Sequence, residues 1–249
     1  FICCNSINKV IVTKPGSLKG FYMLGITKFI KDNYDLKNTI FYGASAGSWN
    51  SLFYVLNNND DLFLKEIENI DLLDFKSMLD IEYKMKTNIM NRFEKKDFDL
   101  KRLNICVSVF EDYKVKKMIY NKFYSLNDAI NCCIASSHIP YITTRTATYS
   151  YRNKACFDGG FFNSPYSEGV IPNLVVYPEI WNNTKIDNYS RLKNLNIKKL
   201  IYAGYEDTYK NRLFIEESLK INKCDESDWK AGFVQGAASP CIKREKVKI

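Results

Sequence analysis

Short apolar runs rich in β-branched residues alternate with longer segments of helical spacing along this chain. Such runs, bounded by turn residues, are typical of buried strands, and apolar residues spaced at i, i+3 and i+4 are typical of helices. The pattern predicts strands at residues 8–13, 38–42, 103–110, 113–120, 174–178 and 198–204, with an edge hairpin at 146–157. It predicts helices at 18–32, 46–56, 126–136 and 207–220. This alternation indicates an α/β fold with a mostly parallel central sheet flanked by helices.

Residues 61–96 interrupt the alternation, because they are charged, amphipathic and mainly helical. We interpret them as a helical insertion or a lid. No internal repeat and no linker rich in Pro, Gly or Ser divides the chain. The 249 residues are therefore expected to form one domain, 1–249, which is an ordinary size for an α/β fold.

The composition excludes several classes of protein. Hydrophobic residues make up 46% of the chain and charged residues 26%, which is the balance of a globular protein and not of a disordered or fibrous one. No apolar run reaches the length of about 18 residues that spans a membrane. None of the eight cysteines forms a CxxC motif, so we expect free, buried thiols and a reducing, cytoplasmic setting. For Cys3-Cys4 an incidental role is favoured over lipidation.

The net charge of +8 permits binding to a phosphate-rich partner or to an anionic lipid surface. Basic residues gather at Lys114, Lys116 and Lys117 and again in the tail at 243–248. No nucleic-acid-binding motif accompanies them, so nucleic acid is not an expected partner. Two interpretations of these basic residues stay open, namely an ordinary solvated face and peripheral contact with a membrane surface, and the pattern predicts no particular oligomeric state.

One segment has the pattern of a nucleophilic serine. Gly43-Ala44-Ser45-Ala46-Gly47 is a GxSxG motif that follows a predicted strand and opens a predicted helix. Small residues at Gly43 and Gly47 allow the sharp turn that exposes a serine hydroxyl at such a position. The helix N-terminus supplies free backbone N–H groups and a positive dipole end for a developing oxyanion. We expect Ser45 to be a nucleophile; the alternative is a glycine-rich turn with an incidental serine.

Two groups compete for the role of general base. His138 is the only histidine, and the order Ser45, Asp112, His138 matches the order of an α/β-hydrolase triad. His138 lies in a turn-like stretch before a proline, however, and a structural role is favoured for it. The second candidate is Asp158, which precedes Gly159-Gly160 in a tight turn. A partly desolvated carboxylate can act as a base, whereas an Asp-Gly pair can equally just close a loop.

A third element lies between the first predicted strand and the first predicted helix, in residues 14–20 (KPGSLKG). Gly16 permits a backbone conformation that directs N–H groups into a site. Ser17 is expected to be the N-cap of the helix. The segment is therefore a helix-capping loop, an oxyanion loop, or both.

These three elements together resemble the patatin-like phospholipase family. The order is the loop after the first strand, the GxSxG motif after the second, and Asp158-Gly159-Gly160 about a hundred residues later. LKGFYMLGITKFI, FYGASAGS, CIASSHIPYIT and FDGGFFNSP look most like the branch that holds adipose triglyceride lipase and adiponutrin. The likeness spans about residues 10–165. It departs from the family pattern at Pro15 and Ser17, where glycines are usual, and at Trp49, which either narrows an acyl pocket or fills the core.

The resemblance implies a lipid acyl hydrolase of phospholipase A type with a Ser45–Asp158 dyad and an acyl-serine intermediate. It implies oxyanion donors at Gly16, Ser17 and Ala46, a basic position at Lys19 followed by Gly20, and no metal or cofactor. A triacylglycerol lipase or a transacylase of the same fold is an alternative. A second alternative is a non-catalytic lipid-binding scaffold with a degraded oxyanion loop.

Overall fold

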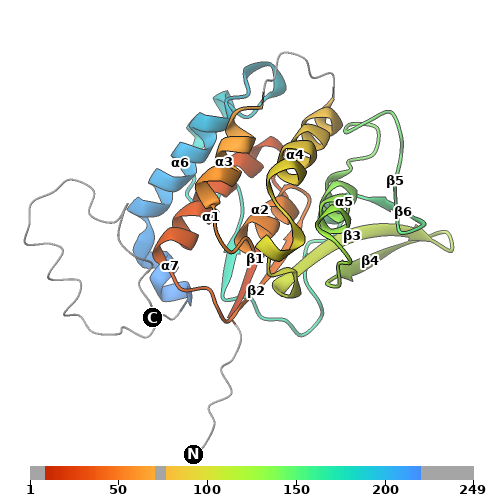
Figure 1. The fold of residues 1–249 in the computed structure, drawn as a ribbon, viewed down its shortest axis with the longest axis horizontal. Coiled ribbons are helices and arrows are strands. Elements are labelled where there is room, and N and C mark those ends of the chain that lie inside the picture. Colours follow the sequence, from red (N-terminus) through yellow and green to blue (C-terminus); the bar gives the residue numbers. More distant parts are fainter. Residues whose placement is uncertain (1–8, 71–76, 220–249) are drawn as a thin grey trace, which may run out of the picture.

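The computed structural model describes residues 9–70 and 77–219, which form a seven-stranded sheet with helices around it (Figure 1). The strands are β1 (Lys9–Thr13), β2 (Thr39–Ala44), β3 (Leu103–Glu111), β4 (Lys114–Tyr120), β5 (Tyr149–Tyr151), β6 (Lys154–Phe157) and β7 (Leu174–Val176). The helices are α1 (Gly20–Asn33), α2 (Ala46–Tyr54), α3 (Asp60–Glu68), α4 (Met78–Arg92), α5 (Leu126–Ser137), α6 (Ile197–Lys210) and α7 (Arg212–Leu219).

The sheet runs in the order β5-β6-β3-β2-β1-β7, and β4 also pairs with β3. Strands β7, β1, β2 and β3 are parallel, whereas β4 and β6 pair antiparallel to β3, and β5 pairs antiparallel to β6. The predicted α/β class with a central sheet flanked by helices is confirmed. The parallel pairings lie on one side of β3, and the antiparallel hairpin predicted at 146–157 is present as β5 and β6.

Strand β3 has two successive partners along one path of the sheet. Its first half, up to Cys106, pairs with β2, whose last residue Ala44 lies opposite Cys106. Its second half pairs with β6, whose last residue Phe157 lies opposite Ser108. Residues along a strand are spaced by about 3.3 Å, so the ends of β2 and β6 lie roughly two residue spacings apart along β3. The chain that leaves each strand therefore begins in the same small region.

The helix α2 is the centre of the packing. It contacts β1, β2 and β3, and α1 and α5 contact it in turn. Every residue of α2 after Ala46 is buried. Helix α6 packs along α1, and α4 packs on both α3 and α5, as the ribbon shows (Figure 1). Because α2 is covered by strands and helices together, its N-terminus is held in a fixed position.

The strand predicted at 198–204 is wrong, because this segment is the first half of α6. Its buried residues Ile197, Leu200, Ile201 and Gly204 have the i, i+3, i+4, i+7 spacing of a helix that buries one face. Asn196 caps the helix, since its side chain accepts a hydrogen bond of 2.9 Å from the N–H of Lys199. The helix predicted at 207–220 is thus divided between α6 and α7.

The segment 61–96 is helical, as predicted, and contributes α3 and α4; residues 71–76 lie outside the described residues. The predicted free thiols are confirmed for the four cysteines that are described, which are all buried: Cys106, Cys132, Cys133 and Cys156. Cys3, Cys4 and the basic tail at 243–248 lie outside the described residues. Within residues 9–70 and 77–219, no helix is long and apolar enough to cross a membrane.

Candidate active site

Ser45 occupies a strained turn between β2 and α2. Its φ of 54° and ψ of −131° lie in a region that residues with a side chain rarely adopt. Two buried serines hold this conformation: the Ser45 N–H donates to Ser136 Oγ at 2.8 Å, and Ser48 Oγ donates to the Ser45 carbonyl at 2.6 Å. The side chain that this turn presents is only 3% exposed. The GxSxG motif therefore has the geometry expected of a nucleophile elbow.

The motif glycines allow two close approaches of backbone. A Cβ atom on Gly47 would collide with the carbonyl oxygen of Thr13, and one on Gly43 would collide with the carbonyl of Gly47. The first turn of α2 therefore lies directly against the end of β1, and only glycine fits there. This packing keeps the N-terminus of α2 at the carboxyl ends of the parallel strands.

Asp158 follows the last residue of β6 and caps a short 3-10 turn, Gly159–Phe161. Its Oδ1 accepts a hydrogen bond of 3.2 Å from the N–H of Gly160. Its backbone is fixed on both sides, because its N–H donates to the His138 carbonyl at 2.8 Å and its carbonyl accepts from Ser108 Oγ at 2.7 Å.

Gly159 and Gly160 complete this turn. A Cβ on Gly159 would collide with the Cys106 carbonyl, and one on Gly160 would press on the Pro15 ring. The turn after β6 therefore touches both β3 and the loop after β1. The loops that follow β1, β2 and β6 are far apart in the sequence, and they meet at the carboxyl ends of the parallel strands.

The Ser45 side chain lies near enough to the Asp158 carboxyl to lower its pKa. Burial raises the pKa of the Asp158 carboxyl above its ordinary value, while the hydrogen bonds from Gly160 and Ser45 act in the opposite direction. A hydroxyl next to a partly desolvated carboxylate can lose its proton to that carboxylate as it attacks an electrophile. The structure thus brings together the two residues that the sequence predicted as nucleophile and base.

The loop at 14–20 reaches the same region but does not cap the helix as predicted. Ser17 has a positive φ of 48°, is exposed, and begins a 3-10 turn, Ser17–Lys19, that leads directly into α1. Its side chain makes no cap hydrogen bond, and the residue before α1 is Lys19. The prediction that Ser17 is the N-cap is wrong, because the extra turn moves the helix start to Gly20.

Ser17 and Ala46, from two different loops, line the same cavity as Ser45. Ala46 is the first residue of α2 and Ser17 the first of its 3-10 turn, so neither N–H has an acceptor within its own helix. A Cβ on Gly20 would press on the Ala46 Cβ, so the two loops are in contact. Gly20 therefore permits the approach to the elbow, whereas a Cβ on Gly16 would meet the Met23 side chain instead.

The side chain of Lys19 forms ion pairs with two acidic residues. Its ammonium pairs with Asp187 at 2.9 Å and with Glu179 at 3.4 Å. The hydrogen bond with Asp187 raises the pKa of Lys19 above its ordinary value. The ion pairs of Lys19, the basic position of the family motif, therefore connect the loop at 14–20 to the segment 179–187.

His138 has a structural environment. The side chain is 1% exposed, its Nε2 lies 3.2 Å from the Thr146 carbonyl, and its ring contacts Tyr149. Burial lowers the pKa of its imidazole below the ordinary value. Asp112, its partner in the alternative triad, is in a turn between β3 and β4 and pairs with Lys116 at 2.8 Å. The structure supports the interpretation of His138 as a structural residue.

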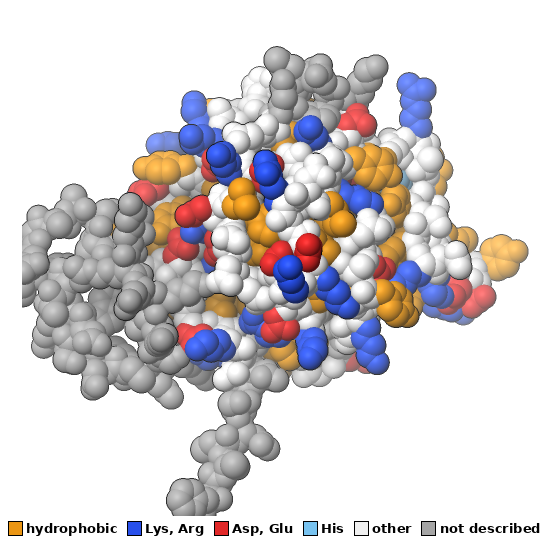
Figure 2. Space-filling model, viewed as in Figure 1, with side chains coloured by type: hydrophobic (Ala, Val, Ile, Leu, Met, Phe, Trp, Pro, Cys, Tyr) orange, Lys and Arg blue, Asp and Glu red, His pale blue; other side chains and the backbone are white. Residues whose placement is uncertain are grey.

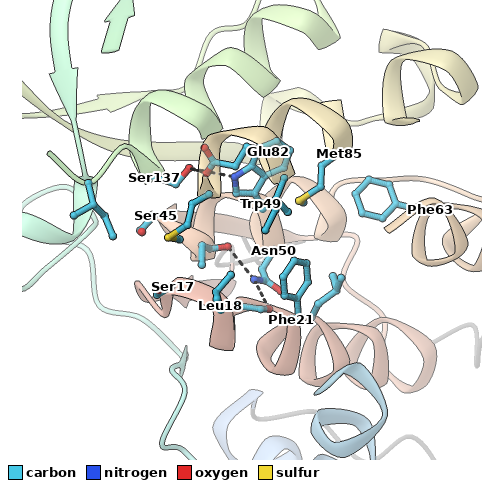
Figure 3. Close-up of a pocket in the computed structure, with 16 residues that line it drawn as sticks. Ser17, Leu18, Phe21, Ser45, Trp49, Asn50, Phe63, Glu82, Met85 and Ser137 are labelled. Carbon is cyan, nitrogen blue, oxygen red and sulfur yellow. Dashed lines mark hydrogen bonds between the residues drawn. The ribbon is translucent and has the colours of Figure 1, made fainter. Parts of the chain in front are cut away.

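A cavity of about 70 Å³ opens beside Ser45. Its walls are mostly apolar, and Figure 3 shows Leu18 and Phe21 on one side and Trp49 and Met85 on another. Trp49 is 7% exposed, so it fills the core, and it also lines the cavity; that it narrows an acyl pocket stays a prediction. The helix α4 supplies one wall, so part of the segment 61–96 covers the cavity; its movement as a lid stays a prediction.

Sequence reasoning missed Glu82, which lies in this apolar wall on α4. It is 8% exposed, and its Oε1 forms a short hydrogen bond with the Ser137 hydroxyl. Burial raises the pKa of its carboxyl to about 8. The sequence carries one sign that Glu82 is buried: it lies between Ile81 and Met85, on the face of the helix that the apolar residues define.

The comparisons with known proteins agree with this geometry. The family model described as patatin-like phospholipase matches residues 14–168, which include the loop after β1, the elbow and Asp158. The chain therefore belongs to the patatin-like phospholipase family. Family membership indicates a hydrolase that acts on lipid esters. No curated protein matches the chain. The likeness to the adipose triglyceride lipase and adiponutrin branch stays a prediction.

Proposed function

We propose that this protein is a lipid acyl hydrolase of phospholipase A type, with Ser45 as the nucleophile and Asp158 as the general base. The observation that carries the proposal is the strained Ser45 turn next to the partly buried Asp158 carboxylate, both fixed along β3. No imidazole is needed, which agrees with a chain whose single histidine is engaged elsewhere.

The acylation step follows from these positions. Ser45 Oγ attacks the carbonyl carbon of the ester while its proton passes to the Asp158 carboxylate. The carbonyl oxygen becomes an oxyanion, for which the N–H groups of Gly16, Ser17 and Ala46 and the N-terminus of α2 are the proposed donors. When the ester C–O bond breaks, the leaving alcohol takes the proton from Asp158, and the acyl group remains on Ser45.

Deacylation reverses the roles with water as the nucleophile. Asp158 accepts a proton from the attacking water, and a second oxyanion forms at the same donors. Ser45 Oγ then leaves with that proton, and the fatty acid is released. The apolar cavity next to Ser45 is the proposed position of the acyl chain, because its walls offer contact to methylene groups.

A fluorophosphonate probe tests the proposal, since it labels only an activated serine. We expect labelling of the wild type, none of Ser45→Ala, and at least a hundredfold slower labelling of Asp158→Asn, in line with the usual contribution of a general base of about 10²–10⁴. Matched controls are Ser150→Ala on β5 and Asp112→Asn, whose side chains are exposed. Unlabelled wild type would favour a non-catalytic scaffold, and full labelling of Asp158→Asn would exclude Asp158 as the base.

Phospholipid is the proposed substrate. Fatty-acid release is measured on phosphatidylcholine mixed micelles and on a triacylglycerol emulsion, and acyl transfer to an added lysophospholipid is followed in parallel. We expect release from the micelles to be fastest. Faster release from triacylglycerol, or transfer exceeding release, would identify the lipase or the transacylase instead.

A further inference from the structure

The cavity next to Ser45 extends away from the elbow and ends at an aromatic side chain. Ser45 and Phe63 both line the cavity and lie at opposite sides of it in Figure 3. Trp49 and Met85 lie between them in that view. Phe63 belongs to α3 and is only 2% exposed. A chain that enters the cavity beside Ser45 therefore meets the ring of Phe63 at the far end.

The helices α1 and α2 run in the same direction away from the elbow. At the start of both helices, a Cβ on Gly20 would press on the Ala46 Cβ. Near their ends, Lys31 Nζ donates to the Phe53 carbonyl at 2.7 Å. Both helices line the cavity, so it follows the groove between them from Ser45 towards the last turn of α2.

The ring of Phe63 is fixed where α2 ends. Its centroid lies 5.0 Å from that of Phe53, in the last turn of α2, and 5.9 Å from that of Phe93. The Phe93 ring in turn contacts Phe98, and all four rings are buried. Of these four rings, only that of Phe63 lines the cavity. Phe63 is therefore the boundary between the cavity and a packed aromatic cluster.

The length of α2 gives the scale of the cavity. Ala46 and Phe53 are seven residues apart, which is about 10 Å along a helix, or roughly the length of an extended chain of eight carbons. A longer chain cannot continue in this direction, because the rings behind Phe63 are packed and protein interiors leave few voids.

We propose that Phe63 determines the length of acyl chain that this protein accepts, so that chains of about eight carbons are preferred over longer ones. The inference rests on the proposed function, because it places the acyl chain in this cavity. Each methylene group that is buried against the walls strengthens binding by roughly three- to fourfold until the chain reaches Phe63. Further methylene groups stay in water, so the gain ends at that length.

The kinetic test measures kcat/KM of the full chain for 4-nitrophenyl esters of the saturated acids from butanoic to tetradecanoic acid. We expect kcat/KM to rise up to the octanoate ester and then to level off or fall. Phe63→Leu shortens the side chain that closes the cavity, so it should raise the ratio of kcat/KM for decanoate over octanoate by roughly tenfold. Phe63→Ala should move the optimum to still longer chains.

Phe93→Leu is the matched control. The Phe93 ring contacts Phe63 but does not line the cavity, so this variant also loses an aromatic ring from the cluster without opening the cavity. We expect its chain-length optimum to equal that of the wild type. An equal shift in Phe93→Leu and Phe63→Leu, or an unchanged optimum in a folded Phe63→Leu protein, would overturn the inference.

A binding measurement separates this inference from the proposed function. Ser45→Ala, which cannot turn over, is titrated calorimetrically with the linear 1-alkanols from hexanol to dodecanol. We expect the affinity to rise up to octanol and then to stay constant, and to rise further to decanol when Phe63→Leu is added. An affinity that increases steadily through dodecanol in Ser45→Ala, or no binding of any alkanol, would overturn the inference even if no Phe63 variant folds. Wild type without esterase activity would exclude the proposed function alone, since the calorimetry still decides the role of Phe63.

Discussion

At the scale of single residues, the site concentrates conformational strain at Ser45. Non-glycine residues held in such backbone regions cost roughly 1–3 kcal/mol, which the surrounding structure must offset. Ser136 and Ser48 fix the two backbone groups of Ser45, and Ser136 Oγ in turn donates to the Cys106 carbonyl at 2.7 Å. The strain is thus borne by contacts to α2, α5 and β3 together.

The environment of Asp158 sets the acid limit of the reaction. Its ordinary pKa is 3.8, and burial raises the pKa in the folded chain. The base must be ionised, so activity falls as the pH falls through this raised pKa. We therefore expect the acid limb of kcat/KM to lie above the ordinary carboxyl value of 3.8, measured with a soluble 4-nitrophenyl ester to avoid changes in lipid packing. An acid limb at or below the ordinary value of 3.8 would contradict the assignment of Asp158 as the base.

Glu82 makes a second pH-dependent prediction, on stability. The pKa of its carboxyl is about 8 in the folded chain and 4.5 ordinarily, so between these values the folded state holds a proton that the unfolded state has lost. Raising the pH across this window therefore destabilises the wild type, by roughly 1 kcal/mol per pH unit. Glu82→Gln has no such proton, so its stability advantage over wild type should grow from about pH 5 to about pH 8 and then level off.

Urea unfolding at a series of pH values measures this difference in the free energy of unfolding. Met85→Leu is the matched control, because it alters the same cavity without a titratable group, and its offset from wild type should not change with pH. A Glu82→Gln advantage that is constant across the window would show that Glu82 is ionised in the folded chain.

At the scale of elements, α1 and α6 approach each other through glycines. A Cβ on Gly25 would collide with the Ile201 carbonyl, and one on Gly204 would collide with the Tyr22 carbonyl. The two helices thus pack backbone against backbone, and Tyr22 Oη adds a hydrogen bond of 2.8 Å to Asp207. This contact holds α1, and with it the loop that precedes α1.

Gly204→Ala tests this crossing. Helix propensity alone favours alanine by about 1 kcal/mol, but the collision with the Tyr22 carbonyl should reverse the sign and destabilise the fold by roughly 1–3 kcal/mol. Tyr202→Ala, on the exposed face of the same helix, should change the stability by about 0.5 kcal/mol or less. Thermal unfolding of both variants checks the prediction; a Gly204→Ala protein as stable as wild type would mean that the helices can separate.

The elements also show which parts of the structure could be predicted from the sequence and which could not. The strand before Ser45 and the helix after it follow from local pattern, and the motif order pointed to Asp158. The fold of 198–204 does not follow, because Ile-Tyr in an apolar run suits a strand, whereas the structure buries one helical face of this segment and packs Gly204 on α1. The burial of Glu82 was equally hard to predict, since a glutamate in a charged helix usually faces solvent.

At the scale of the whole molecule, positive and negative side chains alternate and do not form a patch of one sign on the face shown in Figure 2. Figure 2 shows basic and acidic side chains interspersed over one face. On β4, Lys116 pairs with Glu111 and Asp112, and Lys117 donates to the carbonyls of Ser164 and Tyr166. These lysines are therefore partly neutralised or engaged, which weakens the sequence argument for a basic patch there.

Membrane binding is accordingly expected to be weak and electrostatic. The net charge of +8 should give more sedimentation with phosphatidylcholine vesicles that contain phosphatidylserine than with phosphatidylcholine alone. The difference should disappear near 1 M salt, where the screening length is about 3 Å. Lys114→Glu should reduce binding to the anionic vesicles at low salt, and equal binding to both vesicle types would argue against an electrostatic contribution.

The shared use of β3 by β2 and β6 has a consequence for how this chain can change in evolution. The separation of Ser45 and Asp158 is set by the two residue steps between Cys106 and Ser108, not by the long stretch of chain that joins them. Segments may therefore be added to or removed from the connection through α3 and α4 without moving either residue. One residue inserted between Cys106 and Ser108 would instead turn the following side chains to the opposite face of the sheet and separate the pair.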